Sequence, residues 1–281
     1  MIMYSKNILD KGNITLLNVA NAIPRSYQPF DASDADPAIV ARQCFASFGE
    51  ERAVELDLRL VKHLEANKHT SCLEMTEFWF SMKLPLFVAD QFKRHRSAIL
   101  LENEEAQQFL SSETSMYNDP TINQTSARYV PLEAEWYIPE VVGGKAISAK
   151  QGQEDNLSAH TQKTFKILLD TTCKDSYGKY IDSINSGIAP EHARLFLHTN
   201  HYTSWVWKQD LHNLFHFMML RTDAHAQLEA RVYAEAMYGL ISEVLPETMK
   251  IFDAHRRLDI ERSKVTEAEL ILLRRIREGT V

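Results

Sequence analysis

Glycine is scarce in this chain, and the common phosphate-binding loops that depend on glycine are absent. Nine of the 281 residues are glycine, and none of them forms a G-x-G-x-x-G turn or a G-x-x-x-x-G-K-S/T loop. These absences exclude a Rossmann dinucleotide cradle and a P-loop. An anionic ligand held by arginine and histidine side chains in a local basic pocket stays compatible with the sequence.

Cysteines are few, and long apolar runs are missing. The three cysteines, Cys44, Cys72 and Cys173, are far apart and show no C-x-x-C spacing, which argues against a disulfide framework and a cysteine zinc site. No run approaches the roughly 18 apolar residues that span a bilayer. The N-terminal stretch lacks the basic and apolar regions of a signal peptide. We therefore expect a cytoplasmic protein without a membrane partner.

Positive charge is in the minority. The chain has 31 Lys and Arg against 38 Asp and Glu, a formal charge of −7, which argues against general nucleic-acid binding. Its 44% hydrophobic and 25% charged residues are typical of a soluble globular protein. No linker rich in proline, glycine or serine divides it. We expect a single domain over residues 1–255 and a charged amphipathic helix over 256–281.

Hydrophobic periodicity predicts mainly helices and one clear strand. Thr76, Phe78, Phe80 and Met82 alternate with other residues, which predicts a strand with one buried face. Residues 126–130 and 135–139 look extended. Helices are predicted over 36–67, from Pro85 to Arg96, within 97–120, over about 153–176, from Pro190, and over 210–221 and 224–245, with a stop at Pro246.

Two short segments combine cations with polar groups. Gln91–Arg96 (QFKRHR) places several cations at a predicted helix end, where they suit the helix dipole; taken alone, this solvated role is favoured over anion recognition by arginine. Asn123–Tyr129 (NQTSARY) sets small hydroxyl groups beside an arginine. A phosphate clamp and a polar turn entering a strand explain it equally well.

Arg221 and a group of histidines lie further along the chain. Arg221 follows the apolar run LFHFMML, so either Asp223 is its ion partner or its guanidinium faces negative charge developing in a substrate. His212 and His216 have the i, i+4 spacing of a zinc pair, but HNLFH lacks the glutamate of H-E-x-x-H, so packing histidines are the better default. The other histidines of this region are His192, His198, His201 and His225.

Four segments together resemble the flavin-dependent thymidylate synthases, in that family's order. The family signature R-H-R-x-x-S-x-N-E-x-S-x-R-Y is similar to Arg94-His95-Arg96 followed by TINQTSARY over residues 121–129. Upstream, HTSCLE over residues 69–74 resembles H-x-S-x-x-E. Downstream, residues 207–236 resemble the long C-terminal helical segment. The resemblance spans roughly residues 38–250, and four ordered matches are more specific than any one.

The chain departs from the family pattern in two ways. Between Arg96 and Thr121 lie 24 residues, 97–120, where the family has two, so an insertion must leave both halves of the signature adjacent. Thr121 replaces the usual serine and Gln124 the usual glutamate. Glutamine keeps an acceptor, loses the charge and gains two donors, which leaves the identity of the pyrimidine open.

The resemblance implies an α/β fold with a mixed central sheet flanked by helices, and a homotetramer with active sites at subunit interfaces. It implies reductive methylation of dUMP to dTMP, with 5,10-methylenetetrahydrofolate as carbon donor, FAD as redox cofactor and NADPH as reductant. Arg221 would be catalytic, stabilising the ionised uracil whose C5 is nucleophilic. No metal and no cysteine nucleophile are implied, and Cys72 beside His69 is discounted because residues three apart in a strand face opposite sides.

The resemblance also assigns roles to individual residues. Flavin binding falls to His69, Ser71, Arg94, His95, Arg96, Asp210, Leu211, His212 and His216. Nucleotide binding falls to Gln91, Phe92, Lys93, Arg94, Gln124, Thr125, Ser126, Ala127, Arg128, Arg194 and Arg221.

Three alternatives stay open at this point. Gln124 motivates a related flavin enzyme acting on another pyrimidine nucleotide such as dCMP. The insertion motivates a flavin- or nucleotide-binding homologue that has lost catalysis because folate access is blocked. A zinc hydrolase built on the histidines is the third.

Overall fold

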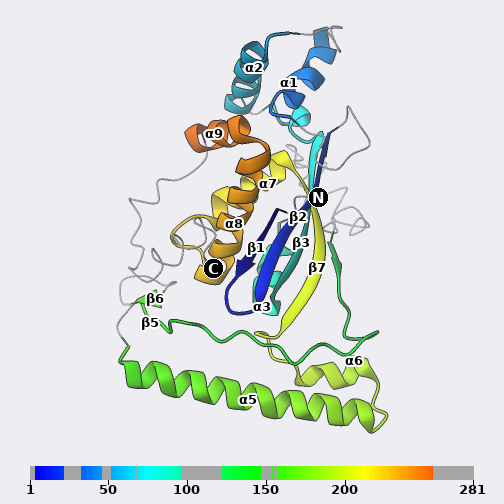
Figure 1. Cartoon of the computed structure of the whole chain (residues 1–281), viewed down its shortest axis with the longest axis vertical. Helices are drawn as coiled ribbons and strands as arrows, with labels where there is room; N and C mark the ends of the chain where they lie inside the picture. Colours follow the sequence, from blue (N-terminus) through cyan, green and yellow to red (C-terminus); the bar gives the residue numbers. More distant parts are fainter. Residues whose placement is uncertain are drawn as a thin grey trace, which may run out of the picture.

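The computed structural model describes residues 4–21, 33–45, 52–67, 69–95, 122–146, 153–154 and 157–255, which form a central sheet surrounded by helices (Figure 1). Five strands pair in the order β1-β2-β3-β7-β4. They are β1 (Tyr4–Ile8), β2 (Gly12–Asn21), β3 (Thr76–Pro85), β7 (Tyr202–Asp210) and β4 (Ile122–Gln124). The expected α/β class, with helices flanking a central sheet, is confirmed.

All described pairings within this sheet are antiparallel, which corrects the expectation of a mixed sheet. A tight hairpin joins β1 to β2, and every later strand returns alongside its neighbour in the opposite direction. No described pair therefore needs the crossover connection that parallel strands require. In the centre, Glu77 of β3 pairs with Asp210 of β7, and Pro85 pairs with Tyr202.

The hairpin β1–β2 forms one edge of the sheet, although the sequence patterns predict no element there. Its turn includes Leu9 at φ 59°, in the left-handed region. Gly12, the first residue of β2, has no room for a side chain. A Cβ at this position would lie 2.7 Å from the carbonyl oxygen of Ile8 and 2.8 Å from that of Lys83.

One face of the sheet carries the core. The predicted alternation holds in β3, where Phe78, Phe80 and Met82 are buried and the residues between them are half-buried. Helices α3 (Leu86–Phe92), α7 (Leu211–Arg221) and α8 (Leu228–Val244) cover this face (Figure 1). The strand prediction for this segment and the helix predictions over 210–221 and 224–245 are confirmed within a few residues.

Short helices gather at the end of the sheet where β3 begins and β7 ends (Figure 1). They are α1 (Asp36–Ala41), α2 (Val54–Ala66) and α9 (Pro246–His255), with the 3-10 turns η1 (Arg42–Phe45) and η2 (Thr70–Cys72). The single helix predicted over 36–67 is thus divided, and α1 gives way to a 3-10 turn at Arg42. Pro246 ends one helix and begins the next, because proline suits the first helical turn.

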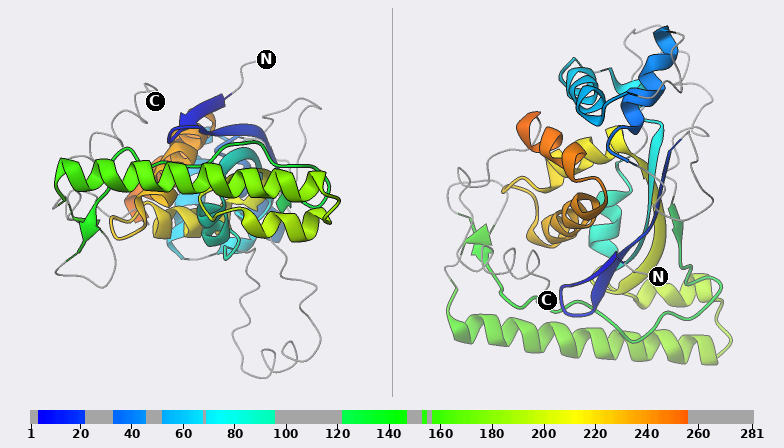
Figure 2. Two further views of the ribbon diagram at one scale, coloured as in Figure 1. Left: turned by 90° about the horizontal axis from the view of Figure 1, so that it is seen from below. Right: turned by 45° about the horizontal axis from the view of Figure 1, so that its top comes forward.

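The opposite end of the sheet is covered by α5 (Ala159–Asn185), which crosses the whole width of the molecule (Figure 2). It is followed by α6 (Pro190–Ala193) and the 3-10 turn η4 (Arg194–Phe196), and preceded by the small ladder of β5 (Gly144–Lys145) and β6 (Gln153–Glu154). Helix α5 begins after its N-cap, Ser158, whose hydroxyl accepts from Thr161 N, and so starts later than predicted.

Several expectations are corrected or lie outside the described residues. Residues 126–130 form a turn rather than an extended segment, because Tyr129 N and Val130 N both donate to the carbonyl of Ser126. The helical content expected within 97–120 and the C-terminal helix expected over 256–281 lie outside the described ranges. Within those ranges, no helix is long and apolar enough to cross a membrane.

Candidate functional site

His95 and Arg221 meet on the helix-covered side of the sheet, although 126 residues separate them in sequence. Helix α3 ends at Phe92, earlier than predicted, and a turn in which His95 N donates to Phe92 O places His95 beside α7. Arg221 is the last residue of α7. Its Nε donates to Nε2 of His95 at 2.9 Å, so two of the predicted site residues are in direct contact.

The imidazole of His95 is enclosed on several sides. The ring of Phe217 meets it edge to face at 5.0 Å between centroids, and His216 lies 6.4 Å away. Gln209 of β7 donates its side-chain amide to the carbonyl of His95 at 3.3 Å. Burial, followed by the charges of Arg221 and His216, lowers the pKa of His95 from 6.5 to about 4. The ring is therefore neutral at pH 7.

The guanidinium groups of Arg94 and Arg221 lie close enough to influence each other. Among the residues that the structure describes, no carboxylate forms an ion pair with either. Asp223, considered above as a partner for Arg221, instead accepts from His225 N at 2.8 Å and contacts its ring. Burial and then the charge of Arg94 lower the pKa of Arg221. Two cations without an anion form a site suited to an anionic ligand.

An amide pair lies next to this group. Nε2 of Gln91, on α3, donates to Oε1 of Gln227, the residue just before α8. We call Gln91, Arg94, His95 and Arg221 the His95 cluster. Gln227 was not among the predicted site residues, although it follows Arg221 by six residues and lies near the start of a predicted helix.

The other predicted flavin residues belong to two segments, one at η2 and one at the start of α7, both at the end of the sheet where β3 begins. His69 and Ser71 are exposed there, just before β3. His212 and His216 lie one turn apart on α7, and His216 faces His95. Leu211 is fully buried, so its side chain belongs to the core and only its backbone is free to contact a cofactor.

Asp210 is the N-cap of α7. One of its carboxylate oxygens accepts from Asn213 N at 2.9 Å and the other from Asn213 Nδ2 at 2.7 Å. Its acceptors therefore hold the first turn of the helix.

A second group of predicted residues surrounds Glu191 of α6. Arg128 Nε lies 3.3 Å from Glu191 Oε2, and Arg194 Nε donates to the backbone carbonyl of Glu191 at 3.3 Å. The hydroxyl of Ser126 accepts from Arg128 N at 3.3 Å. We call Arg128, Glu191 and Arg194 the Glu191 cluster. Sequence reasoning missed Glu191, although it precedes Arg194 by three residues on a predicted helix.

Strand β4 connects the signature motif to the Glu191 cluster. Gln124 pairs with Trp205, its Nε2 donates to Thr203 Oγ1 at 3.0 Å, and Thr125 N donates to Ser204 O at 2.8 Å. At the other end of β4, Ile122 pairs with Trp207, two positions from Gln209, which contacts His95. Both described ends of the excursion over 96–121 therefore meet on β7, as the adjacency of the two signature halves requires.

The two clusters contact β7 at different positions along the strand. Gln209 contacts His95, whereas Ser204 contacts the segment that leads to Arg128. Five residues of strand correspond to roughly 17 Å. The contact points of the two clusters on β7 are therefore roughly 17 Å apart.

Comparison with known proteins places this arrangement in a family. Residues 27–247 match the family described as thymidylate synthase complementing protein. The chain belongs to this family. The family expected from the four ordered motifs is confirmed, and the chain is thereby an enzyme of the methyltransferase class.

Curated members of the family resemble the chain over most of its length. A flavin-dependent thymidylate synthase from Gluconobacter oxydans is 36% identical over 227 residues, which cover 79% of this chain and 68% of that protein. One from Thermus thermophilus is 34% identical over 268 residues, covering 95% and 84%. The crystal structure of a UMP/dUMP methylase, PolB from Streptomyces cacaoi, bound with 5-Br dUMP, has a TM-score of 0.69 at 22% identity, covering 90% of this chain and 99% of that one. That likeness concerns the fold.

Some of the predicted nucleotide-binding residues have no free polar group in the side chain. Phe92 is fully buried and Ala127 nearly so, which leaves their backbone for ligand contact. Lys93 pairs with Asp90 at 3.4 Å. Arg96 lies outside the described residues. The placement of His69, Ser71, Gln124 and Arg194 as ligand-binding residues stays a prediction.

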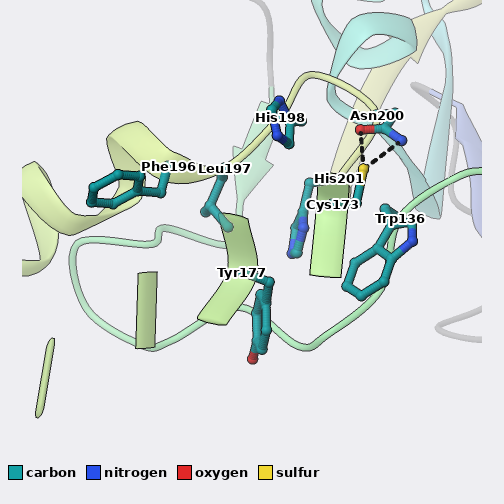
Figure 3. A pocket seen from close by; sticks show the side chains of 8 residues that line it. All are labelled: Trp136, Cys173, Tyr177, Phe196, Leu197, His198, Asn200 and His201. Carbon is teal, nitrogen blue, oxygen red and sulfur yellow. Dashed lines mark hydrogen bonds between the residues drawn. The ribbon is translucent and has the colours of Figure 1, made fainter. Parts of the chain in front are cut away.

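A small pocket lies elsewhere, between α5 and the start of β7 (Figure 3). It contains none of the predicted site residues. Tyr177 stacks on His201 at 5.9 Å, and Asn200 Nδ2 lies 3.4 Å from Cys173 Sγ. Burial raises the pKa of the Cys173 thiol, which keeps it protonated. Across the described residues, no three His, Cys, Asp or Glu side chains gather as a metal site.

Proposed function

We propose that this enzyme converts dUMP to dTMP by reductive methylation, with FAD as the bound flavin, 5,10-methylenetetrahydrofolate as the carbon donor and NADPH as the reductant. One observation carries the proposal. Arg94 and Arg221 pair with no carboxylate among the described residues, and Arg221 is held by a neutral histidine. A cytoplasmic location, expected from the composition, suits this reaction.

The residues present fit an anionic dinucleotide cofactor. The guanidinium of Arg94, which pairs with no carboxylate among the described residues, would supply positive charge to a diphosphate. Exposed His69, Ser71 and His216, at the same end of the sheet, add hydrogen-bonding groups. These residues, with His212, would hold FAD; Arg96, expected from the resemblance to join them, lies outside the described residues. When bound, reduced FAD supplies the hydride for the transfer.

Arg221 would act on the uracil ring. Nucleophilic attack by C5 on the one-carbon donor is easier when negative charge on the ring oxygens is stabilised. The terminal amino groups of Arg221, a partly buried cation, supply that stabilisation in a site of reduced solvent access. Cys72 does not fit a covalent role, because burial raises the pKa of its thiol and thiols react as thiolates.

The phosphate of dUMP would lie at the Glu191 cluster. Arg128 and Arg194 are exposed and close together, and Ser126 with the turn that follows it presents a hydroxyl and backbone N–H groups. Gln124 and Thr125 border this position on β4.

Self-association follows from the separation of the clusters. The two clusters of one chain contact β7 at points roughly 17 Å apart, which favours a site in which the pyrimidine ring and the phosphate are bound by different copies. A second copy of the chain, placing its Glu191 cluster near the first copy's His95 cluster, completes the site. We therefore infer a homo-oligomer, with a homotetramer as the expected state.

The decisive experiment is product analysis with matched pyrimidine nucleotides. The purified protein is incubated with methylenetetrahydrofolate, NADPH and either dUMP or dCMP, and the products are identified by mass spectrometry. We expect dTMP from dUMP and no methylated product from dCMP. Methylation of dCMP alone would identify dCMP as the substrate, which the replacement of the usual glutamate by Gln124 leaves open. A yellow protein that binds dUMP but forms no product would support loss of catalysis.

Arg221→Ala tests the role of the guanidinium. We expect loss of methylation by roughly 100-fold or more with flavin still bound, because a preorganised charge against the reacting ring is removed. Arg59→Ala, at an exposed arginine of α2, is the matched control and should retain full activity. Full activity in Arg221→Ala would contradict the assignment.

A further inference from the structure

We propose that His95 is a positioning residue for Arg221: its Nε2 accepts the Nε–H of Arg221 and so directs both terminal amino groups, at full charge, toward the uracil ring. The ligand in this inference rests on the proposed function, whereas the hydrogen bond itself does not. The resemblance assigned His95 only to the flavin, so the contact with Arg221 gives this residue a second task.

The imidazole is fixed independently of Arg221. Gln209 holds the backbone of His95 by its carbonyl, and Phe217 packs edge to face against the ring. Phe217 lies one helical turn before Arg221 on the same helix. Helix α7 therefore supplies both the ring that orients His95 and the N–H that His95 accepts.

The tautomer follows from the contact. Nε2 can accept only when the ring is neutral and its proton resides on Nδ1. Burial and the neighbouring cations disfavour the charged ring, which would repel Arg221. The same groups that surround the ring therefore keep it an acceptor at neutral pH. The titratable or charged groups that act on the ring are Arg221 and His216 on α7, and Arg94, on the turn after α3, acts on Arg221.

A neutral acceptor has a consequence that a carboxylate would not have. Most partly buried arginines pair with Asp or Glu, which cancels their charge. His95 engages the Nε–H alone, and the remaining four N–H groups on Nη1 and Nη2 keep their fork geometry. The guanidinium is thus oriented without being neutralised, which is what stabilisation of an ionised ring requires.

Three substitutions separate orientation from charge. His95→Phe keeps a ring and removes the acceptor; His95→Gln restores an acceptor at similar reach; His95→Glu supplies an acceptor that neutralises the guanidinium. We expect His95→Phe to lower kcat for dUMP by roughly 10- to 100-fold, as misplacement of a reacting group does. His95→Gln should recover most of that loss, and His95→Glu should not.

A second readout is independent of activity. In protein labelled with ¹⁵N-arginine, the Nε–Hε resonance of Arg221, identified by its loss in Arg221→Lys, reports the hydrogen bond through its exchange with water. We expect slow exchange in the wild type and in His95→Gln, and fast exchange in His95→Phe. Failure of the wild type to methylate dUMP would refute the proposed function and leave this measurement valid.

Two outcomes would overturn the inference. One is exchange at Arg221 that is equally fast in the wild type and His95→Phe. The other is a His95→Phe protein whose whole defect is flavin loss, with kcat per bound flavin unchanged. Circular dichroism and unfolding midpoints of each variant separate misfolding from either result, and His95→Gln provides the folded variant should His95→Phe not fold.

Discussion

Individual cations in this enzyme are held by partners that differ in charge, and the difference predicts their roles. Arg221 is held by a neutral histidine and Arg128 by the carboxylate of Glu191. The first keeps its full charge, whereas the second must exchange one anion for another when a phosphate binds. The sequence shows both arginines near polar residues but not this distinction, because each partner comes from a distant segment of the chain.

The environment of His95 predicts a pH dependence of folding. Its pKa is about 4 in the folded protein against 6.5 for an unperturbed histidine, so between these values the unfolded chain binds more protons. The free energy of unfolding therefore falls as pH decreases below 6.5, by about 2 kcal/mol at pH 5 from this residue. Urea unfolding at pH 7.5 and pH 5 should show a larger loss in the wild type than in His95→Gln.

Other groups that titrate in this range contribute equally to both proteins and cancel. Burial also lowers the pKa of His201, for example, which is present in both. Equal losses of stability in the wild type and His95→Gln would contradict the assignment of a neutral, buried ring at position 95.

Glu191 is predicted to compete with the nucleotide phosphate. Its carboxylate and that of a phosphate need the same guanidinium, Arg128, and the existing pair is half-exposed, hence worth about 0.4–1 kcal/mol. Glu191→Gln should therefore strengthen dUMP binding by about two- to fivefold, measured as Kd by calorimetry. Glu243→Gln, an exposed acid of α8, is the control. Weaker binding in Glu191→Gln would mean that the carboxylate instead orients Arg128 for the phosphate.

Elements of this fold were predictable where one face is buried against local neighbours. The alternation in β3 was read correctly because helices cover one face of that strand. The hairpin β1–β2 was missed because β2 is stabilised by β3, from a distant part of the chain, and because a bulge between Leu16 and Asn18 breaks its alternation. The turn after Ser126 was read as extended because its β-branched and aromatic residues favour strands, whereas two hydrogen bonds to one carbonyl close it.

The hairpin gives a stability prediction at Gly12. Adding a Cβ there forces it against the carbonyl oxygens of Ile8 and Lys83 and against the hydroxyl of Tyr233, which itself donates to Lys83 O. Gly12→Ala should lower the free energy of unfolding by about 3 kcal/mol. Gly178→Ala is a matched control, because nothing lies within 4 Å of a Cβ at that helical position. It should raise stability by about 0.5–1 kcal/mol.

Urea denaturation of the two variants at one pH distinguishes a steric clash specific to Gly12 from the general effect of replacing glycine with alanine. If both substitutions changed stability by the same small amount, the close approach of β2, β3 and α8 at Gly12 would be refuted. A large loss confined to Gly12→Ala would tie the N-terminal hairpin to α8 through Tyr233, and so to the helix layer that carries the site.

At the scale of the whole molecule, a chain of net charge −7 places Arg94 and Arg221 close together on its helix-covered face, with no carboxylate partner among the described residues. The absence of glycine-rich loops excluded a Rossmann cradle and a P-loop, and it left open an anion site built from arginine and histidine side chains. The sequence motifs identified the family correctly but could not divide the predicted site residues between two clusters. That division depends on the antiparallel register of β4 on β7, which spacing does not reveal.

The division into two clusters predicts complementation between inactive chains. Arg221→Ala destroys the His95 cluster and leaves the Glu191 cluster intact; Arg128→Ala does the reverse. If each site draws one cluster from each of two copies, chains mixed in equal amounts will assemble some sites from two intact halves. With random assembly, about one quarter of the sites are intact. Activity should therefore return to about a quarter of the wild-type value when the two variants are co-expressed, although each alone is inactive.

The control is a mixture of Arg221→Ala with Arg94→Ala, two substitutions within the same cluster, in which every assembled site lacks one of the two cations. That mixture should stay inactive at every ratio, because a second copy cannot supply an intact His95 cluster when both kinds of chain carry a damaged one. Size-exclusion chromatography must show the same oligomer in both mixtures. If the Arg221→Ala and Arg128→Ala mixture were as inactive as its components while the oligomer formed, each chain would have to use its own two clusters. That result would contradict the two-copy site and the homo-oligomer inferred from it.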